Sequence, residues 1–437
     1  MTMPAATVAN TTAFTTMRAR IAQLVLGNHA LGWADQAIAS ATSFLILVVM
    51  GRSTTPHELG VYVIGMSILA LLIAAQESLI TRPYSVQLSR VADSPKDHAS
   101  STLGLSMLFS ACSASIAAVA ALMFSVFDAD HALVNIAWML AGAIPFVLIR
   151  EFARRFAFAH MAFGYALALD CVVAVLVALA FAILTWSGQL SAANAIVAIG
   201  LACGLAAFGW LYYARCEFSW SFRTLSPTLR RNWKMGKWFL SSQLAIQIQA
   251  YIAPWLALTI AGAAMTGIYA ACTSIVAFVN PVLFGAFNVL LPKFVRVLQQ
   301  QGLLALRWHA YFESVLLAAI MGAFALVIFE CGDDIMSLLY RGDAYVGYGD
   351  VLTVLAVASL AAAVGAPASI ALAAADHARS VAFVTALTAL LNLVLIAALL
   401  PAYGLLGAAY GVLAAETVGS TGRWVAFLLL PSNGTRE

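Results

Sequence analysis

Residues 60–80 read GVYVIGMSILALLIAAQESLI, and in this stretch only Glu77 carries a charge. A bilayer core about 30 Å thick needs roughly 20 apolar residues in a helix, so the stretch has the length and composition of a transmembrane span. The whole chain of 437 residues shares this character, with 63% hydrophobic residues, 9% charged residues and a mean hydropathy of +0.94. Alternating ten-residue segments typical of a membrane β-barrel are absent. The composition therefore predicts an all-α membrane protein.

Eleven further apolar runs, separated by polar breaks, accompany this stretch. They predict about twelve transmembrane helices in two sets of six. The first set is expected at 33–50, 60–80, 102–124, 134–149, 165–186 and 192–213. The second set is expected at 238–260, 265–291, 311–329, 351–372, 381–400 and 403–430.

Basic residues are distributed unevenly among the connections. Of the 22 Lys and Arg residues, all but Arg52, Arg341 and Arg423 fall in the tails or in the connections that follow even-numbered spans. The positive-inside rule then places both termini and the loops 81–100, 150–160 and 214–237 on the cytoplasmic side of a bacterial inner membrane. The opposite face carries acidic residues, namely Asp128, Asp130, Asp333, Asp334, Asp343 and Asp350. No cleaved signal peptide is expected at the N-terminus.

An internal repeat relates the two halves. A shift of 207 residues aligns Gln36 with Gln243 and Gly60 with Gly267, and the same shift aligns Tyr62 with Tyr269. Because the shift spans six helices, both halves have the same orientation, which predicts a parallel repeat around a central cavity. The expected division is a cytoplasmic segment 1–30, an N-terminal bundle 31–225 and a C-terminal bundle 226–437. Chance similarity between apolar helices is the alternative.

Several polar side chains lie within the expected spans. Gln36, Gln243, Gln247 and Asn280 are candidates for a polar cavity wall, and hydrogen bonding between helices is the alternative. Ionisable groups at membrane depth are costly and tend to face a cavity. The candidates for ion coupling are Asp35, Glu77, Asp170 and Glu416. Their alternative roles are interfacial placement or, for Glu416 with Arg423, a structural ion pair.

Residues 44–62, FLILVVMGRSTTPHELGVY, resemble the opening of polysaccharide-exporting flippases of the multidrug/oligosaccharidyl-lipid/polysaccharide superfamily, which include O-antigen flippases. Further matching motifs are RPY at 82–84, REFARR at 150–155, GIY at 267–269 and GLLGAAY at 404–410. The chain lacks the two additional C-terminal spans of peptidoglycan lipid flippases. The resemblance implies a transporter that moves a polyprenyl-pyrophosphate-linked oligosaccharide across the cytoplasmic membrane by alternating access.

This resemblance also suggests partners and binding residues. The implied partners are the lipid-linked oligosaccharide, membrane lipids and, in exopolysaccharide or O-antigen biosynthesis, a polymerase and chain-length machinery; no nucleic-acid partner is expected. A pyrophosphate headgroup needs cationic donors, and Arg pairs with phosphate in a bidentate manner. The headgroup candidates are Arg82, Arg150, Arg154 and Lys237, with Arg82 and Arg150 favoured. A purely topological role or contact with anionic lipid explains these cations equally well.

Other functional classes find less support. No nucleotide-binding or hydrolytic motif is present, so we expect neither an enzyme nor a cofactor. The six cysteines form no C-x-x-C pair, and no metal site is expected. An ion-coupled multidrug exporter of the same architecture is the main alternative, supported by Asp35, Glu77 and Trp255. A membrane-embedded glycosyltransferase, ligase or polymerase would usually need a larger outer loop than 330–350.

Overall fold

The computed structural model describes residues 31, 34–88, 95–127, 131–219 and 225–431. The predicted N-terminal segment 1–30 and the acidic residues Asp128 and Asp130 lie outside these ranges. The described helices of the first half are Ala34–Ser53, α2 (Pro56–Gln76), η1 (Glu77–Thr81), α3 (Arg82–Gln87), α4 (Pro95–Val126), α5 (His131–Ala159), α6 (Phe163–Trp186), α7 (Ala192–Tyr213) and η2 (Ala214–Glu217). Those of the second half are α8 (Leu225–Ala261), α9 (Ala263–Val276), η3 (Ala277–Val279), α10 (Asn280–Leu339), η4 (Asp343–Tyr345), α11 (Gly349–Ala374) and α12 (Ala378–Leu428).

Twelve helical passes can be traced through the described ranges. Ten of the described helices are long and apolar enough to cross a membrane. Two of them, α10 and α12, are each long enough for two passes. The backbone of α10 breaks at Gly302 (φ 80°) and that of α12 at Gly404 (φ 59°), a positive-φ conformation that glycine adopts without steric penalty. The first part of α10 continues the path of α9 and completes the eighth pass. The prediction of an all-α membrane protein with about twelve spans is confirmed.

Short capped turns join the helices at one end of the molecule. Thr55 caps α2, because its hydroxyl accepts a hydrogen bond from the Glu58 amide at 3.3 Å while Pro56 occupies the first helical turn. Ser191 caps α7 in the same way through the Asn194 amide at 3.2 Å. The Glu58 carboxylate accepts a further hydrogen bond from the Ala192 amide at 2.6 Å, which ties the two turns together.

Long helical extensions, rather than loops, occupy much of the other end. The predicted loops 81–100, 150–160 and 214–237 were wrong as loops: α3 continues to Gln87, α5 continues to Ala159 and α8 begins at Leu225. Arg, Glu and Lys are good helix formers, so charged residues do not by themselves end a helix. The charged side chains of 150–155 therefore stay in register on one helix.

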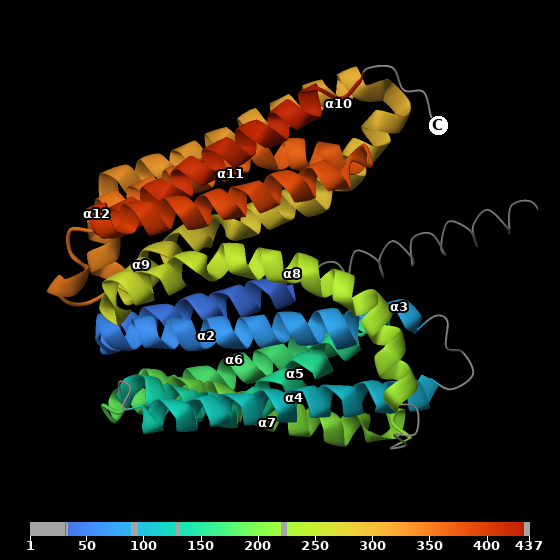
Figure 1. The fold of residues 1–437 in the computed structure, drawn as a ribbon, viewed down its shortest axis with the longest axis vertical. Coiled ribbons are helices and arrows are strands. Elements are labelled where there is room, and N and C mark those ends of the chain that lie inside the picture. Colours follow the sequence, from blue (N-terminus) through green and yellow to red (C-terminus); the bar gives the residue numbers. More distant parts are fainter. Residues whose placement is uncertain (1–30, 32–33, 89–94, 128–130, 220–224, 432–437) are drawn as a thin grey trace, which may run out of the picture.

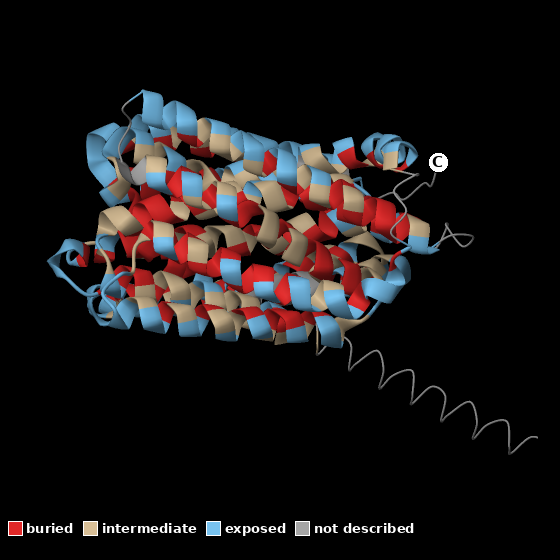
Figure 2. Ribbon diagram, turned by 90° about the horizontal axis from the view of Figure 1, so that it is seen from below, coloured by how far each residue is buried: buried red, intermediate tan, exposed pale blue. Residues whose placement is uncertain are grey.

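We name the two ends of the molecule after the charged residues that they carry. The acidic end carries Asp333, Asp343 and Asp350, and the basic end carries Arg82 and Lys293. In Figure 1 the halves lie close together at the acidic end, and α10, α11 and α12 diverge from the N-terminal half toward the basic end, whereas α8 stays beside α2. Apolar side chains such as Ile116, Trp186 and Phe329 are exposed on the outside of the bundles, whereas buried residues line the interior (Figure 2). The chain is therefore an integral membrane protein.

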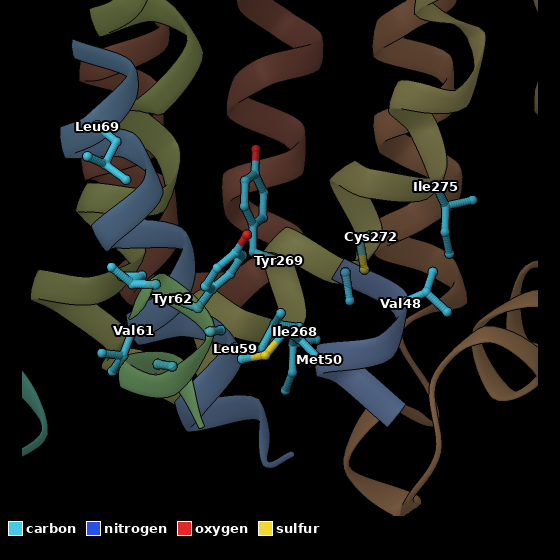
Figure 3. Close-up of a cluster of buried hydrophobic side chains, with 14 of the residues drawn as sticks. Val48, Met50, Leu59, Val61, Tyr62, Leu69, Ile268, Tyr269, Cys272 and Ile275 are labelled. Atoms are coloured by element: carbon cyan, nitrogen blue, oxygen red, sulfur yellow. The ribbon is translucent and has the colours of Figure 1, made fainter. Parts of the chain in front are cut away.

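A glycine crossing joins the halves at the acidic end. A Cβ atom on Gly60 would lie 1.9 Å from the Ala263 carbonyl oxygen, and a Cβ atom on Gly267 would lie 1.9 Å from the Pro56 carbonyl oxygen. The two backbones thus touch at the positions that the 207-residue shift pairs. Beside them the buried Tyr62 and Tyr269 belong to one hydrophobic cluster (Figure 3). This mutual contact is what a parallel repeat predicts, although the exact boundary near residue 225 stays a prediction.

Candidate functional site

A π-helical turn positions the first charged residue of the site. Glu77 opens the turn η1, which interrupts the helix between α2 and α3. Pro83 follows closely, and proline has no N–H and clashes with the carbonyl of the residue four positions earlier, which favours a wider turn at this point. The consequence is that Glu77, Thr81 and Arg82 all reach the same space at the basic end.

Helix α5 supplies four charged residues at helical spacing. Glu151 is buried, with 6% of its surface exposed, and forms ion pairs with Arg155 at 2.9 Å and with Arg154 at 3.5 Å. These are i, i+4 and i, i+3 pairs, the spacings at which helical side chains meet. Arg150 pairs with the same carboxylate at 3.0 Å. One buried glutamate therefore gathers three arginines.

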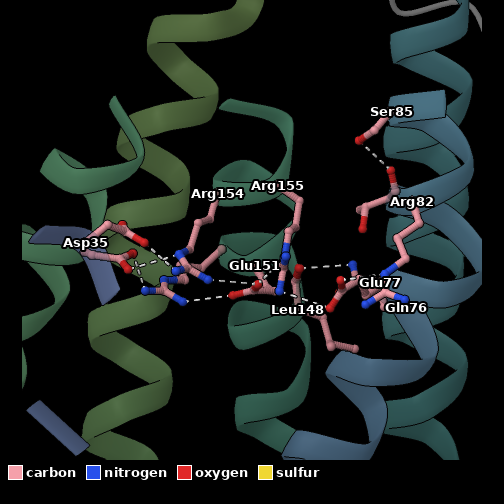
Figure 4. Close-up of polar contacts among 12 residues, drawn as sticks. Asp35, Gln76, Glu77, Arg82, Ser85, Leu148, Glu151, Arg154 and Arg155 are labelled. Atoms are coloured by element: carbon pink, nitrogen blue, oxygen red, sulfur yellow. Dashed lines mark hydrogen bonds and ion pairs between the residues drawn. The ribbon is translucent and has the colours of Figure 1, made fainter. Parts of the chain in front are cut away.

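Carboxylates from three other segments complete the cluster. Glu77 pairs with Arg82 at 2.8 Å and with Arg155 at 3.0 Å. Asp170 of α6 pairs with Arg150 and, at 3.0 Å, with Arg154. Asp35 of the first described helix pairs with Arg154. Figure 4 shows the resulting chain of contacts running from Asp35 through α5 to the end of α2.

This charge cluster consists of Asp35, Glu77, Arg82, Arg150, Glu151, Arg154, Arg155 and Asp170. Its four carboxylates and four guanidinium groups balance formally. Buried ions are stable only when they are paired, and each member of this cluster belongs to at least one ion pair. Three predicted ion-coupling residues and three predicted headgroup residues thus form one site rather than two.

The arginines of the cluster differ in access to solvent. The side chains of Arg82 and Arg155 are 38% and 33% exposed, whereas those of Arg150 and Arg154 are 17% and 13% exposed. Arg82 and Arg155 also line an open cavity of about 390 Å³ together with Glu77, Thr81, Ser85 and Phe239. The structure therefore separates two arginines that a ligand can reach from two that the protein encloses.

Helix α8 forms the opposite wall of this region. Arg82 donates to the Gln243 side chain at 3.5 Å and lies 5.8 Å from the centre of the Phe239 ring. Closer to the basic end, Gln87 donates to Asn232 at 3.1 Å. The predicted headgroup residue Lys237 is exposed and lies over the Trp238 ring at 5.4 Å, and it belongs to no ion pair described for the cluster.

The remaining predicted residues lie elsewhere. Gln36 is exposed and donates to Ser40 at 3.4 Å, and Asn280 is exposed at the start of α10. Gln247 is half-buried on α8. Glu416 accepts a hydrogen bond from Gln249 at 3.3 Å and lies 3.9 Å from Arg423, so it belongs to a separate polar contact in the C-terminal half. A role of these residues in transport stays a prediction.

One central member of the cluster, Glu151, was missed as a site residue by sequence reasoning. The signal was present, because Glu151 precedes Arg154 and Arg155 by three and four residues. Assigning 150–160 to a loop hid that spacing. Among the residues that the structure describes, no group of three His, Cys, Asp or Glu side chains is arranged to hold a metal ion.

Comparison with known proteins gives the family and the fold. A family model described as "Polysaccharide biosynthesis protein" matches residues 34–298. No curated protein sequence matches the chain. A solved structure titled as the inward-facing conformation of a multidrug resistance MATE family transporter of the MOP superfamily is 14% identical, covers 89% of this chain and 94% of its own, and has a TM-score of 0.74.

Two further solved structures share the fold. The lipid II flippase MurJ in an inward closed conformation is 13% identical over 91% of this chain and 87% of its own, with a TM-score of 0.66. A structure titled as the outward-facing conformation of a MATE family transporter is 12% identical over 93% of this chain and 95% of its own, with a TM-score of 0.62. At these identities the likeness establishes a shared transporter fold.

Proposed function

This chain belongs to the polysaccharide biosynthesis protein family, and we propose that it is a flippase for a polyprenyl-pyrophosphate-linked oligosaccharide. In this proposal the protein moves the lipid-linked sugar across the bacterial inner membrane for exopolysaccharide or O-antigen synthesis. The main support for the proposal is the family match together with a cavity at the basic end that exposes two arginines, Arg82 and Arg155.

The geometry of this cavity supports a doubly charged, membrane-linked ligand. Guanidinium groups bind phosphate oxygens through paired, charge-assisted hydrogen bonds. The cavity adds the Thr81 and Ser85 hydroxyls and the rings of Phe158 and Phe239 to the two arginines. Polar donors beside aromatic surface suit a headgroup that remains attached to an apolar chain. The exposure of Arg82 and Arg155 favours them over the enclosed Arg150 and Arg154 as headgroup ligands.

The contacts between the halves support loading from the basic end. The acidic end is closed by the glycine crossing at Gly60 and Gly267, and α10, α11 and α12 diverge from the N-terminal half toward the basic end. The TM-score is also higher against the MATE structure titled inward-facing, 0.74, than against that titled outward-facing, 0.62. In the proposed orientation the basic end and both termini face the cytoplasm, in agreement with the positive-inside rule.

Reconstitution tests the proposal directly. Purified protein is placed in liposomes with a fluorescent polyprenyl-pyrophosphate-linked sugar, and the fraction reaching the other leaflet is measured by quenching. We expect protein-dependent translocation, reduced at least about tenfold by Arg82→Glu because the variant removes a cation and adds a charge that repels phosphate. Lys293→Glu is the matched control, since Lys293 lies at the same end and pairs with Glu313 at 2.6 Å outside the cavity.

Absence of protein-dependent movement, with or without an ion gradient, contradicts the flippase proposal. A second candidate is an ion-coupled multidrug exporter, which is favoured by one observation: Trp255 of α8 is partly exposed and its indole nitrogen donates to Ser67 of the other half at 3.0 Å. An aromatic face between the halves could bind an organic cation. Efflux of cationic dyes that Trp255→Ala abolishes, without sugar-lipid translocation, would establish that alternative.

The proposed polymerase and chain-length partners are tested separately, by asking whether they co-purify with this protein from the membrane.

A further inference from the structure

Glu77 holds the two arginines that the cavity exposes. Its two carboxylate oxygens are divided between them: Oε1 pairs with Arg82 at 2.8 Å and Oε2 pairs with Arg155 at 3.0 Å. All three side chains line the same cavity of about 390 Å³. The carboxylate therefore occupies the position between two guanidinium groups that an anionic ligand would need.

We propose that Glu77 is a displaceable counter-ion, which an incoming diphosphate group replaces on Arg82 and Arg155 and which returns to eject that group at the end of transport. The inference rests on the proposed function, because it assumes that the cavity receives the lipid diphosphate. It assigns to Glu77 a role in setting affinity and release.

The other contacts of the two arginines make such an exchange feasible. Arg155 also pairs with Glu151 at 2.9 Å, so its guanidinium remains held when Glu77 leaves. Arg82 donates to Gln243 and lies over the Phe239 ring, which holds it from the side of α8. Both arginines are thus positioned independently of Glu77. A ligand would meet a preorganised pair of donors, which lowers the entropic cost of binding.

The deeper part of the charge cluster lacks this freedom. Arg154 contacts three carboxylates, those of Asp35, Glu151 and Asp170, and its side chain is 13% exposed. All three carboxylates are buried, so displacing one of them would take an ion partner from buried charges that water does not reach, which is costly. The Glu77 side chain is also buried, with 10% of its surface exposed, but it lines the open cavity, so that a carboxylate turning away from the arginines can be hydrated there.

Thr81 adds a hydroxyl group to the wall of the cavity beside the two arginines. It lines the cavity, only 4% of its surface is exposed, and its hydroxyl oxygen has no hydrogen-bond partner in the described structure. Buried polar groups are nearly always satisfied, so each exception calls for an explanation. A phosphate oxygen bound between Arg82 and Arg155 could accept the hydrogen bond that the Thr81 hydroxyl can donate.

Formal charge explains why Glu77 must leave when the diphosphate binds. The cluster is balanced at four positive and four negative groups. Adding a diphosphate while Glu77 remains in place would crowd several negative charges around two cations. Moving Glu77 into the solvated part of the cavity relieves that repulsion. The competition between ligand and carboxylate then weakens binding enough for release after translocation.

The test measures binding and turnover of the Glu77→Gln variant. Purified protein in phosphatidylcholine nanodiscs is titrated with farnesyl diphosphate, and with inorganic pyrophosphate to separate a lipid-linked from a free ligand. We expect Glu77→Gln to bind farnesyl diphosphate about tenfold or more tightly, because the neutral amide no longer competes for two charge-assisted hydrogen bonds. In liposomes carrying the fluorescent sugar lipid, the variant should lower both KM and kcat, since release becomes slower.

Two further variants keep the result interpretable. Glu313→Gln removes a carboxylate from an ion pair outside the cavity and should change neither affinity nor turnover. Glu77→Asp retains the charge on a shorter side chain and should bind with intermediate affinity. It also replaces Glu77→Gln as the decisive variant if that protein does not fold, as judged by its thermal melting.

The outcomes distinguish this inference from the proposed function. Tighter binding with slower turnover in Glu77→Gln supports the displaceable counter-ion. Unchanged or weaker binding by a folded Glu77→Gln overturns it, while diphosphate binding by the unaltered protein leaves the headgroup site standing. If neither the unaltered protein nor Glu77→Gln binds farnesyl diphosphate, both the proposed headgroup site and the counter-ion role of Glu77 are contradicted. Tighter binding of inorganic pyrophosphate than of farnesyl diphosphate contradicts the lipid-linked ligand and retains the exchange itself.

Discussion

The two ends of the molecule join its halves in different ways. At the acidic end the contact is made by backbone atoms, with Gly60 of α2 lying against Ala263 and Gly267 of α9. At the basic end the contacts are made by long polar side chains, as in the pair of Gln87 with Asn232 and that of Arg82 with Gln243. The first contact has no polar side chain in it. The second combines polar side chains with a backbone approach, because a Cβ atom on Gly236 would lie 2.9 Å from the Ser78 carbonyl oxygen.

This difference indicates how each end responds to motion. A glycine crossing either closes fully or separates, because neither residue has a side chain that could bridge a gap. Long polar side chains can rotate and exchange partners while the backbones move apart. We therefore expect the acidic end to act as a switch between closed and open, and the polar pairs of the basic end to adapt gradually to a ligand.

The largest expected effect comes from breaking the enclosed part of the basic end. Arg154→Ala leaves the buried carboxylates of Asp35 and Asp170 without one of their cations, and removing one partner of a buried ion pair typically costs about 3–5 kcal/mol. Thermal denaturation in detergent, followed by tryptophan fluorescence, should show a large fall in the melting temperature. Arg82→Ala is the comparison, because its ion pair is much more exposed and should contribute about 1 kcal/mol or less.

Equal melting temperatures for Arg154→Ala and Arg82→Ala would show that the charge cluster is not divided into an enclosed and an accessible part.

A smaller loss of stability, but a specific loss of transport, is expected from Gly60→Leu. Even the Cβ atom would meet the Ala263 carbonyl oxygen at 1.9 Å, so the acidic end cannot close without backbone shifts, and overpacking of this kind costs about 1–3 kcal/mol. Accessibility of a cysteine placed near the crossing should rise, and sugar-lipid translocation should fall. Gly142→Leu is the matched control, since no atom lies within 4 Å of the corresponding Cβ position.

Wild-type transport by Gly60→Leu would contradict the view that the glycine crossing must close during the cycle.

The smallest effect is expected at the polar contact between the halves. Gln87→Ala removes the hydrogen bond to Asn232, and a hydrogen bond contributes about 0.5–1.5 kcal/mol net. We expect a melting temperature close to that of the unaltered protein and a modest change in translocation rate. A loss as large as that of Gly60→Leu would mean that the basic end is as rigid as the acidic end.

Sequence reasoning and structure agree on the spans and differ on the connections. Span positions such as 165–186 and 192–213 match α6 (Phe163–Trp186) and α7 (Ala192–Tyr213) closely, because the length of an apolar run is a local property. The loop assigned to 150–160 failed because hydropathy marks where lipid ends and does not mark where a helix ends. The candidate arginines and carboxylates were singled out from the sequence for two separate roles, and their mutual pairing was not foreseen.

The amino-acid sequence by itself determined the membrane environment, the approximate spans, the repeat and the family, since apolar length, charge placement and motifs can all be read along one chain. Only the tertiary structure decided that Asp35, Glu77 and Asp170 converge on α5, because these residues come from three different segments that meet through packing. It also decided which arginines remain accessible. Burial depends on neighbours distant in sequence, and for that reason the division between Arg82 with Arg155 and Arg150 with Arg154 could not be read from spacing.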